Sequence, residues 1–349
     1  MMATNRTKIM TLMTTVTGTT SADDAPVCVP HVQNTDIIGE FDMNALYASC
    51  HLCSRHCGVN RLEGKTGICG ATATLKLGRA ALHWWEEPCL VGDSGSGAVF
   101  FSFCSLHCLY CQNYELSHGA GAEITPERLS EIFLELQNDQ HAANINLVTP
   151  GHYLPSIVVA LNRAKQAGLH IPVVYNTSGY ESVEALRLLD GLVDVYLTDY
   201  KYADPQLAHD LSQARDYPER ALEALEEMDR QIKGEFVLDD QGLLQRGIIV
   251  RHLILPHHLQ ASKQALRLIH ERFGSRVRLS IMNQFTPLAH DKRLDALGLN
   301  DTVSSQDYEE VLCFADDLGI EDYFWQEEAA CQESFIPAFD GTGVVSSAN

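Results

Sequence analysis

Apolar runs alternate with amphipathic helical patterns through the middle of the chain. The runs typical of buried strands lie at 97–103, 144–148, 171–175, 194–198, 247–254 and 277–282. Helical patterns begin at Thr125, where Thr is a good N-cap and Pro126 suits the first helical position, and recur at 155–167, 181–189, 205–232, 261–273 and 305–318. Because strands that alternate with helices form parallel sheets, the pattern predicts an α/β fold of six β/α units, either an open doubly wound sheet or a barrel-like one.

Polar side chains follow the end of each predicted strand. Carboxyl ends of parallel strands meet at one edge, where ligands bind in such folds, so these clusters should form one site. In chain order they are Cys104–Cys111, Thr149–His152, Asn176–Gly179, Asp199–Lys201, Pro256–His258 and Asn283–Gln284. For His152, His257 and His258 the alternatives are a role toward substrate and an ordinary structural hydrogen bond.

Charge and cysteine usage narrow the class of protein. The net charge is −21, and after Arg293 there is no Lys or Arg while 13 Asp and Glu follow. That balance argues against a nucleic-acid surface and favours a solvated acidic helix and tail, with docking to a basic partner as the alternative. No run of 18 apolar residues occurs, so no membrane span is expected. Nine of the 11 cysteines fall within 28–111, which favours metal ligation in a reducing cytoplasm over a disulfide scaffold.

The domain organisation follows from these shifts in composition. We expect a disordered leader at 1–40, with a transit peptide as the alternative, a cysteine-rich metal-binding module at 41–92, the β/α core at 93–325 and a tail at 326–349. The turn at 239–242 predicts a hairpin. The charged span 209–247 is interpreted as either a lid or docking element beside the active face or a decoration of the outer wall. A short apolar piece, 323–325, should pack on the core.

Cys104, Cys108 and Cys111 lie on the loop that leaves the first predicted strand. Clustered thiolates bind zinc or iron–sulfur centres. A cubane cluster takes four ligands, so three cysteines leave one iron with an open position, the mark of a chemical rather than a structural metal site. A zinc site completed by His107, His118 or a distant residue is the alternative, although zinc sites usually join two distant pairs of ligands.

The same loop carries a family resemblance. Cys-x3-Cys-x2-Cys after the first strand of a repeated β/α chain, with Tyr110 before the last cysteine, resembles the radical S-adenosylmethionine (radical SAM) superfamily. Further stretches are similar to the group related to pyruvate formate-lyase activating enzymes, and the resemblance runs from about Cys50 to Gly343. These stretches are Gly95–Phe101, Gln112–Glu115, Tyr175–Tyr180, Asp199–Lys201 and Arg251–Pro256.

The resemblance implies a partial (β/α)6 barrel and a set of ligands. Cys104, Cys108 and Cys111 would hold a [4Fe–4S] cluster whose open iron chelates S-adenosylmethionine, and Lys201 would lie near the methionine carboxylate. The expected cofactor-binding residues are Tyr110, Asn176, Thr177, Ser178, Asp199, Lys201 and Arg251. For Lys201 and Arg251, a structural ion pair with Asp199 is the alternative. Two departures stand out: Thr149–His152 replaces a Gly-Gly-Glu-like stretch, and Asn176 stands where activating enzymes often have Asp.

A second group of cysteines, Cys50, Cys53, Cys57 and Cys69, lies in a glycine-rich segment too small to hold a core, so it should need a metal to fold. Four thiolates suit structural zinc, and a second [4Fe–4S] cluster is the alternative. The polar residues Arg55, Asn60 and Arg61 would meet the substrate or lie on the surface, and the second is favoured. Cys89 is interpreted as a spare thiol, and Cys28, Cys313 and Cys331 as isolated cysteines.

The leading functional interpretation is a radical SAM enzyme that forms a 5′-deoxyadenosyl radical and abstracts hydrogen. A protein is a candidate substrate, because the resembled activating enzymes abstract hydrogen from a partner protein. The resemblance also implies an electron donor such as flavodoxin or ferredoxin. The alternative is a non-catalytic zinc or iron–sulfur metalloprotein. An ordinary S-adenosylmethionine methyltransferase is disfavoured because its expected glycine-rich loop after the first strand is missing.

Overall fold

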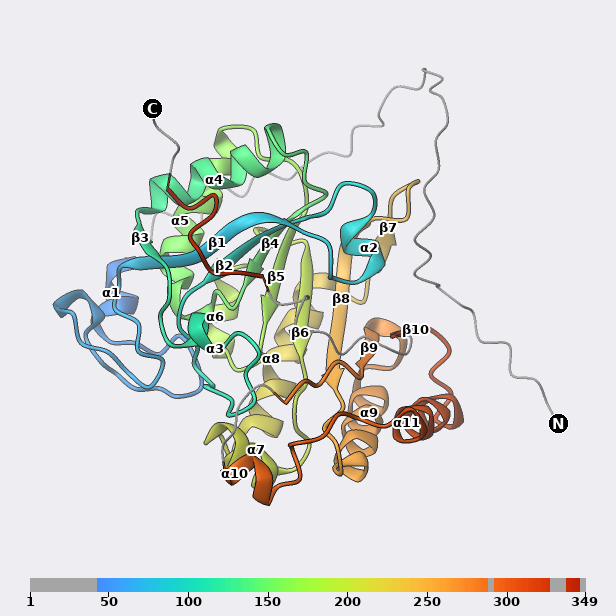
Figure 1. Cartoon of the computed structure of the whole chain (residues 1–349). Helices are drawn as coiled ribbons and strands as arrows, with labels where there is room; N and C mark the ends of the chain where they lie inside the picture. Colours follow the sequence, from blue (N-terminus) through green and yellow to red (C-terminus); the bar gives the residue numbers. More distant parts are fainter. Residues whose placement is uncertain (1–42, 288–291, 327–336, 346–349) are drawn as a thin grey trace.

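A computed structural model describes residues 43–287, 292–326 and 337–345 of the chain. At its centre is a ten-stranded sheet in the order β10-β9-β8-β6-β5-β4-β2-β1-β3, with β7 beside β8 (Figure 1). The parallel strands are β2 (Ser96–Phe101), β4 (Ile145–Val148), β5 (Val173–Thr177), β6 (Val195–Asp199), β8 (Leu244–Leu253), β9 (Arg278–Met282) and β10 (Tyr323–Trp325). The antiparallel strands are β1 (Leu75–His83), β3 (Ala122–Ile124) and β7 (Val237–Leu238).

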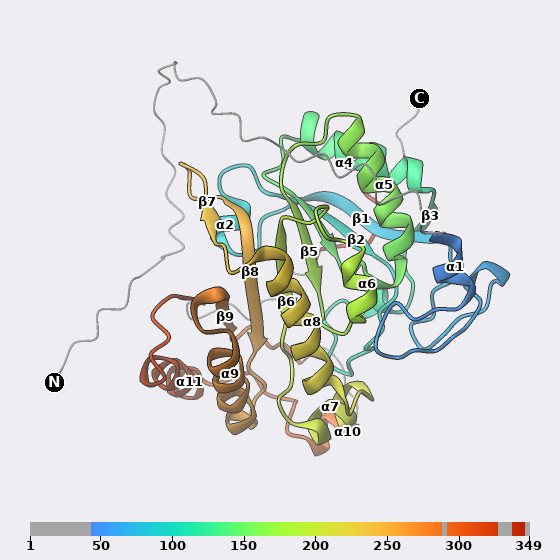
Figure 2. The same cartoon turned by 180° about the vertical axis from the view of Figure 1, so that it is seen from behind.

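The order of the parallel strands decides between the two predicted architectures. From β2 to β10 each parallel strand lies beside the next one in the chain, with no reversal of direction across the sheet. A doubly wound sheet requires such a reversal, because its helices go to both faces. Here the crossover helices lie on one face (Figure 2), and the edge strands β3 and β10 do not pair with each other. The predicted partial barrel is therefore confirmed.

The helices wrap the outside of this partial barrel. They are α1 (Met43–Ala48), α2 (Pro88–Val91), α3 (Tyr114–Ser117), α4 (Pro126–Asn138), α5 (Leu154–Gln166), α6 (Val183–Arg187), α7 (Pro205–Ser212), α8 (Tyr217–Ile232), α9 (Leu259–Phe273), α10 (Lys292–Ala296) and α11 (Ser305–Asp317), with 3-10 turns at Arg61–Glu63, Gly151–Tyr153 and Gly274–Arg276. The start of α4 is as predicted: Thr125 Oγ1 accepts a hydrogen bond from the Arg128 N–H at 3.2 Å. Its apolar face, including Ile132 and Phe133, is buried against the sheet.

The structure adds elements that the sequence pattern did not indicate. β1 pairs antiparallel with β2, so the sheet begins at residue 75, inside the range expected for the cysteine-rich module. The predicted helical stretch 205–232 divides into α7 and α8, because Gln213 adopts a left-handed backbone with φ of 50°. The apolar piece 323–325 forms β10 beside β9, which confirms its packing on the core. The leader and residues 327–336 and 346–349 of the tail lie outside the described residues.

The span 209–247 belongs mostly to the outer wall. α8 is the crossover helix between β6 and β8, and Arg272 of α9 bonds to its Glu226 at 2.5 Å. The predicted hairpin forms between β7 and the amino end of β8, whereas the polar clusters follow the carboxyl ends of the strands. The interpretation as decoration is therefore confirmed for α8 and the hairpin.

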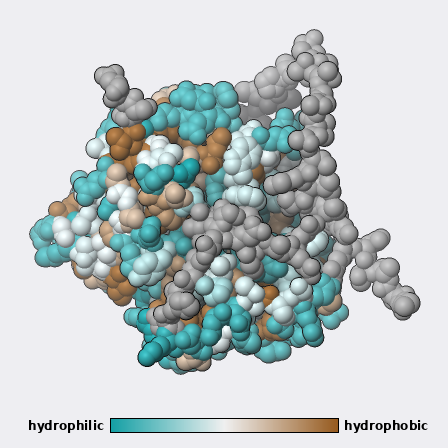
Figure 3. Space-filling model, viewed as in Figure 1, coloured by the Kyte–Doolittle hydropathy of each residue, from teal (hydrophilic) through white to brown (hydrophobic). Residues whose placement is uncertain are grey.

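The described helices are all too short or too polar to cross a membrane. On the face seen in Figure 3, hydrophilic residues cover much of the coloured surface, and apolar residues form small groups between them.

Candidate functional site

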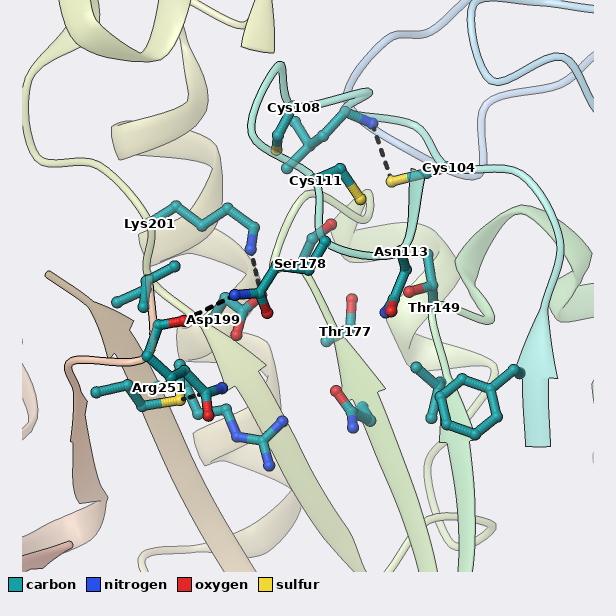
Figure 4. A pocket seen from close by; sticks show the side chains of 18 of the residues that line it. Cys104, Cys108, Cys111, Asn113, Thr149, Thr177, Ser178, Asp199, Lys201 and Arg251 are labelled. Atoms are coloured by element: carbon teal, nitrogen blue, oxygen red, sulfur yellow. Dashed lines mark hydrogen bonds and ion pairs between the residues drawn. The ribbon is translucent and has the colours of Figure 1, made fainter. Parts of the chain in front are cut away.

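One pocket of about 250 Å³ lies at the carboxyl ends of the parallel strands. Cys104, Cys108 and Cys111 stand at one end of it and Arg251 at the other, with Thr177, Ser178, Asp199 and Lys201 between them (Figure 4). Cys104, Cys108, Cys111 and every predicted cofactor-binding residue line this pocket, including Tyr110 and Asn176. The strand ends of β2, β5, β6 and β8 thus meet as the sequence pattern predicts.

The cysteine loop turns back on itself directly after β2. Phe103 and His107 have positive φ angles of 75° and 49°, and these tight bends point the thiols into the pocket. The loop is anchored to the end of α7, because the Leu109 N–H donates to the Leu211 carbonyl at 2.9 Å and Ser212 Oγ donates to Cys108 Sγ at 3.1 Å. No sequence pattern predicted this contribution of α7 to the site.

Burial keeps two of these thiols protonated when no metal is bound. It raises the pKa of Cys104 to about 11 and that of Cys111 to about 12, and the neighbouring thiols raise both pKa values further. A metal that binds here must therefore displace protons from these thiols.

The donor set fits a cluster better than a single ion. Within the described residues, no three His, Cys, Asp or Glu side chains converge as ligands of one metal ion. A four-iron cluster takes each thiolate on a different iron, so its ligands need not converge on one point. The candidate zinc ligands His107 and His118 face each other with ring centroids 5.1 Å apart, and neither lines the pocket. The three thiols fit a [4Fe–4S] cluster that has one free iron position.

Lys201 and Asp199 form a close ion pair at the end of β6, with Nζ and Oδ2 2.5 Å apart. Burial alone would lower the pKa of Lys201, but the Asp199 carboxylate, together with the nearby Tyr110, Cys108 and Tyr217, raises that pKa well above its usual value. The predicted ion pair therefore exists, and it does not remove Lys201 from the pocket, since both side chains keep about a fifth of their surface exposed. Among the described residues, Lys201 Nζ donates a hydrogen bond to Asp199 alone, which leaves two of its three N–H donors for a ligand.

The loop after β4 replaces the Gly-Gly-Glu-like stretch with a different set of contacts. Thr149 adopts a left-handed backbone with φ of 57°, and its N–H donates to the Asn176 carbonyl at 2.8 Å. A Cβ on Gly151 would lie 2.5 Å from Glu181 Oε1, so only glycine lets the buried Glu181 approach. Thr177 Oγ1 donates to the same carboxyl group, whose pKa is raised by burial. Thr149 and Thr177 line the pocket, and a carboxyl group lies directly behind them.

Arg251 has different partners from the one expected. Its guanidinium binds Glu87 in a two-pronged pair, with Nε to Oε1 at 2.8 Å and Nη2 to Oε2 at 2.6 Å, and Nη2 also donates to Glu86. Glu86 Oε1 accepts further hydrogen bonds from Asn146 at 3.0 Å and Asn176 at 3.4 Å. The alternative ion pair with Asp199 is therefore wrong for Arg251, which instead closes the inner end of the pocket.

Glu86 and Glu87 were missed because they precede the recognisable motifs. They follow β1, in a segment assigned to the cysteine-rich module, and come within reach of Arg251 only when β1 pairs with β2. The run Trp84–Glu87, two aromatic residues followed by two acids, was the available signal. His83, Trp85 and Glu86 of this segment all line the pocket.

The three candidate histidines lie outside the pocket. His152 is buried and its Nε2 lies 2.7 Å from the Ser102 carbonyl, and burial, together with the nearby Arg61, lowers its pKa to about 3. His258 Nε2 lies 3.0 Å from the Leu297 carbonyl, and His257 is exposed beside Asp301. The structural interpretation is confirmed for His152 and His258.

The second group of cysteines lies beside the site loop without lining the pocket. Arg55, from the same segment, donates to the carbonyls of Ser105 at 3.0 Å and Ser212 at 2.8 Å, so it ties that segment to the cysteine loop and to α7. Arg61 is buried, so its expected surface position is wrong. Cys89 is buried in α2 and Cys313 is exposed, while Cys28 and Cys331 lie outside the described residues.

Comparisons with known proteins agree with this geometry. A model of the radical SAM superfamily matches residues 98–239. The uncharacterized protein MJ0674 of Methanocaldococcus jannaschii is 28% identical over 251 residues, which cover 69% of this chain and 67% of that protein. No group of activating enzymes is named by these matches, so that finer resemblance rests on the sequence motifs.

Two solved structures have partial likeness to the chain. Streptococcus suis SuiB matches 67% of this chain and 49% of its own length, with 12% identity and a TM-score of 0.43. A radical SAM methyltransferase from Sphaerobacter thermophilus matches 67% of each chain, with 14% identity and a TM-score of 0.43. The chain thus spans about half the length of SuiB. In both the family match and the site geometry, residues 98–239, which hold the three cysteines, Asp199 and Lys201, are similar to a radical SAM domain.

Proposed function

We propose that this chain binds a [4Fe–4S] cluster through Cys104, Cys108 and Cys111, cleaves S-adenosylmethionine reductively, and abstracts hydrogen from a substrate. The observation that carries the proposal is the single pocket that gathers the three thiols with Lys201, Asp199 and the polar end of β5. When bound, the cluster would deliver one electron to the sulfonium group, giving methionine and a 5′-deoxyadenosyl radical. A radical SAM domain indicates an enzyme of this general reaction class.

The residues of the pocket suit the parts of S-adenosylmethionine. Lys201 offers a point charge with two N–H donors to the methionine carboxylate. Thr177 and Ser178 offer oxygens to the ribose hydroxyls, and Tyr110, partly buried and adjacent to Cys111, walls the pocket. The apolar side chains of Leu106, Val148 and Leu253 exclude water from the same space, which protects a reactive species from side reactions.

We further propose that the substrate is a protein segment, as for the activating enzymes that the sequence motifs resemble. Trp84 and Trp85 are 49% and 47% exposed, and Trp85 also lines the pocket, so a large apolar surface continues from the pocket to solvent. Exposed aromatic residues of this kind are typical of surfaces that bind other proteins. The electron would come from a small donor such as flavodoxin or ferredoxin in the cytoplasm.

The test is an anaerobic assay of the full chain. The reconstituted protein is reduced with dithionite, given S-adenosylmethionine, and analysed for 5′-deoxyadenosine. We expect product from the wild type and none from Cys108→Ala. A protein that contains the cluster but forms no product would overturn the proposal in favour of a non-catalytic metalloprotein.

Lys201 gives the same test a binding readout. Lys201→Met should weaken S-adenosylmethionine binding about tenfold or more, because a charge-assisted hydrogen bond is lost. Lys65→Met is the matched control, since Lys65 pairs with Glu63 on the surface. Equal affinities for the two variants would contradict the assignment of Lys201 to the methionine carboxylate.

A further inference from the structure

The segment 49–74, which carries Cys50, Cys53, Cys57 and Cys69, folds as a set of tight turns rather than around a core. The Gly58 N–H donates to the Cys50 carbonyl at 2.9 Å, the His56 N–H to Cys53 at 3.0 Å and the Gly70 N–H to Gly67 at 3.1 Å. Its one regular element is the three-residue turn Arg61–Glu63. A segment this small seldom orders itself by burial alone, and metal ligation supplies the missing free energy in many such folds.

The thiols of Cys50, Cys53, Cys57 and Cys69 are neighbours in the fold, and like those of the pocket they do not converge on one point as ligands of a single metal ion. Cys50 is near enough to Cys53, Cys57 and Cys69 for electrostatic interaction with each. A Cβ on Gly67 would lie 2.6 Å from Cys57 Sγ, so glycine at this position makes room for the thiol. Cys50 and Cys69 are buried, and Cys53 and Cys57 are partly buried.

A buried cation points at this group of thiols. Arg61 is 1% exposed, its Nη2 donates to Cys69 Sγ at 2.9 Å, and its Nη1 donates to the His152 carbonyl. Its Nε has no hydrogen-bond partner, and among the described residues no carboxylate lies within ion-pair distance of the guanidinium. The Tyr47 ring, 5.8 Å from the guanidinium carbon, completes its surroundings.

A guanidinium in such a place needs a negative charge nearby. Arginine stays protonated in proteins, and a buried charge without a counter-charge costs several kcal/mol. Neutral thiols do not supply that charge. Four thiolates around a four-iron cluster do, because their four negative charges exceed the two positive charges of the oxidised cluster core.

We propose that Cys50, Cys53, Cys57 and Cys69 bind one anionic [4Fe–4S] cluster, and that the buried Arg61 is its counter-ion. Binding of a preformed cluster replaces the four thiol protons, which leave to solvent, with four iron–sulfur bonds, and no oxidant or reductant is consumed. Four protein ligands close the centre, so it would hold the segment together rather than react. Through Arg55 the same segment holds the Cys104–Cys111 loop. The proposal does not depend on the function proposed for the pocket.

The first test removes the pocket cysteines so that any remaining metal belongs to the new centre. The full chain with Cys104→Ala, Cys108→Ala and Cys111→Ala is purified anaerobically, and zinc, iron and sulfide are counted before and after incubation with zinc or with ferrous and ferric iron and sulfide. We expect about four irons with sulfide per chain. A folded protein that takes up only zinc, or neither metal, would overturn the proposal.

Single substitutions locate the ligands in the same background. Cys50→Ser, Cys53→Ser, Cys57→Ser and Cys69→Ser should each lose metal to a chelator at least tenfold faster, whereas Cys313→Ser, at an exposed thiol, should not. Near-ultraviolet circular dichroism confirms that each variant is folded before chelation. If Cys69→Ser retained metal like Cys313→Ser, the ligand assignment would be overturned.

Arg61 is tested by how metal removal changes stability. In the wild type, chelation leaves the guanidinium buried without its counter-charge, so the melting temperature should fall steeply. In Arg61→Met no buried cation is left without a counter-charge, so chelation should lower its melting temperature less. Arg61→Lys keeps the charge and should resemble the wild type. Identical falls in Arg61→Met and the wild type would show that Arg61 is not the counter-ion.

Discussion

The molecule places two groups of cysteines side by side in opposite surroundings. Cys104, Cys108 and Cys111 open into a pocket with Lys201, Asp199 and a row of polar strand ends. Cys50, Cys53, Cys57 and Cys69 do not line that pocket, and Cys69 accepts a hydrogen bond from the buried cation Arg61. Three ligands with free space suit a metal that binds a further molecule, and four ligands with a buried counter-charge suit a metal that only stabilises the fold. The environment of the thiols thus predicts their role better than their number.

The largest expected difference between the two groups appears when one cysteine is removed from each. Cys104→Ser should reduce 5′-deoxyadenosine formation to the background level because the cluster loses a ligand, with a modest change in melting temperature. Cys69→Ser should have the larger effect on stability, because the turn-rich segment loses its metal. Its free energy of unfolding should fall by several kcal/mol, and its melting temperature should fall with it. Assay and thermal unfolding of both variants check this. A larger loss of stability in Cys104→Ser would reverse the two roles.

The next largest effect concerns the ion pair at the inner end of the pocket. Arg251→Met leaves Glu86 and Glu87 buried without a counter-charge and should cost about 3–5 kcal/mol in the free energy of unfolding. Arg272→Met, which breaks an exposed pair with Glu226, should cost less than about 1 kcal/mol. Urea unfolding compares the two. If Glu86→Gln and Glu87→Gln added to Arg251→Met recovered no stability, the stranded charges would not be the cause.

A smaller effect is expected from Arg55, which connects the cysteine-rich segment to the Cys104–Cys111 loop. Arg55→Met removes three hydrogen bonds from the cysteine-rich segment, to the carbonyls of Ser105, Ser212 and Gln213, and should cost about 1–3 kcal/mol. Because the Cys104–Cys111 loop loses an anchor, iron retention at the pocket should also fall. Iron analysis after gel filtration measures this, with Arg55→Lys as the variant that keeps the charge but not the forked geometry. An unchanged iron content in Arg55→Met would show that Arg55 does not couple the two regions.

The smallest predicted effect is a dependence of stability on pH through His152, whose carbonyl binds Arg61. Burial, followed by the charge of Arg61, lowers its pKa to about 3, below the value of about 6.5 in the unfolded chain. The unfolded chain therefore binds more protons between these values, and stability falls as the pH drops. From high pH to pH 5.5 the loss from this group should be about 1.4 kcal/mol.

Denaturant unfolding at pH 7.5 and 5.5 measures this loss, with His152→Gln as the control. An equally steep dependence in His152→Gln would assign the loss to other groups.

Much of the core could be predicted because its residues interact mainly with neighbours in the chain. The six predicted strands correspond to β2, β4, β5, β6, β8 and β9 within a few residues, since each is a buried apolar run. The capping of α4 by Thr125 is equally local. Strand ends in a parallel sheet must meet, which is why Asn176, Asp199 and Lys201 were predicted to share a site and do.

The residues that were missed depend on contacts across the sheet. β1 pairs antiparallel with β2, so no crossover helix connects the two strands and the β/α alternation did not predict β1. Glu87 reaches Arg251 across 164 positions of the chain, and Arg55 reaches Ser212 across 157. Contacts between residues this far apart in the chain leave no periodicity or spacing in the sequence from which they could be predicted.

By itself the sequence determined the β/α order, the three thiols after the first parallel strand and the residues at the strand ends, because backbone geometry forces these local patterns into one arrangement. Only the tertiary structure decided that the sheet is singly wound, that Arg251 is held by two glutamates, and that Arg61 is buried against a thiol. Those outcomes depend on which surfaces exclude water together, and a buried charge is neutralised by whatever group the fold brings beside it.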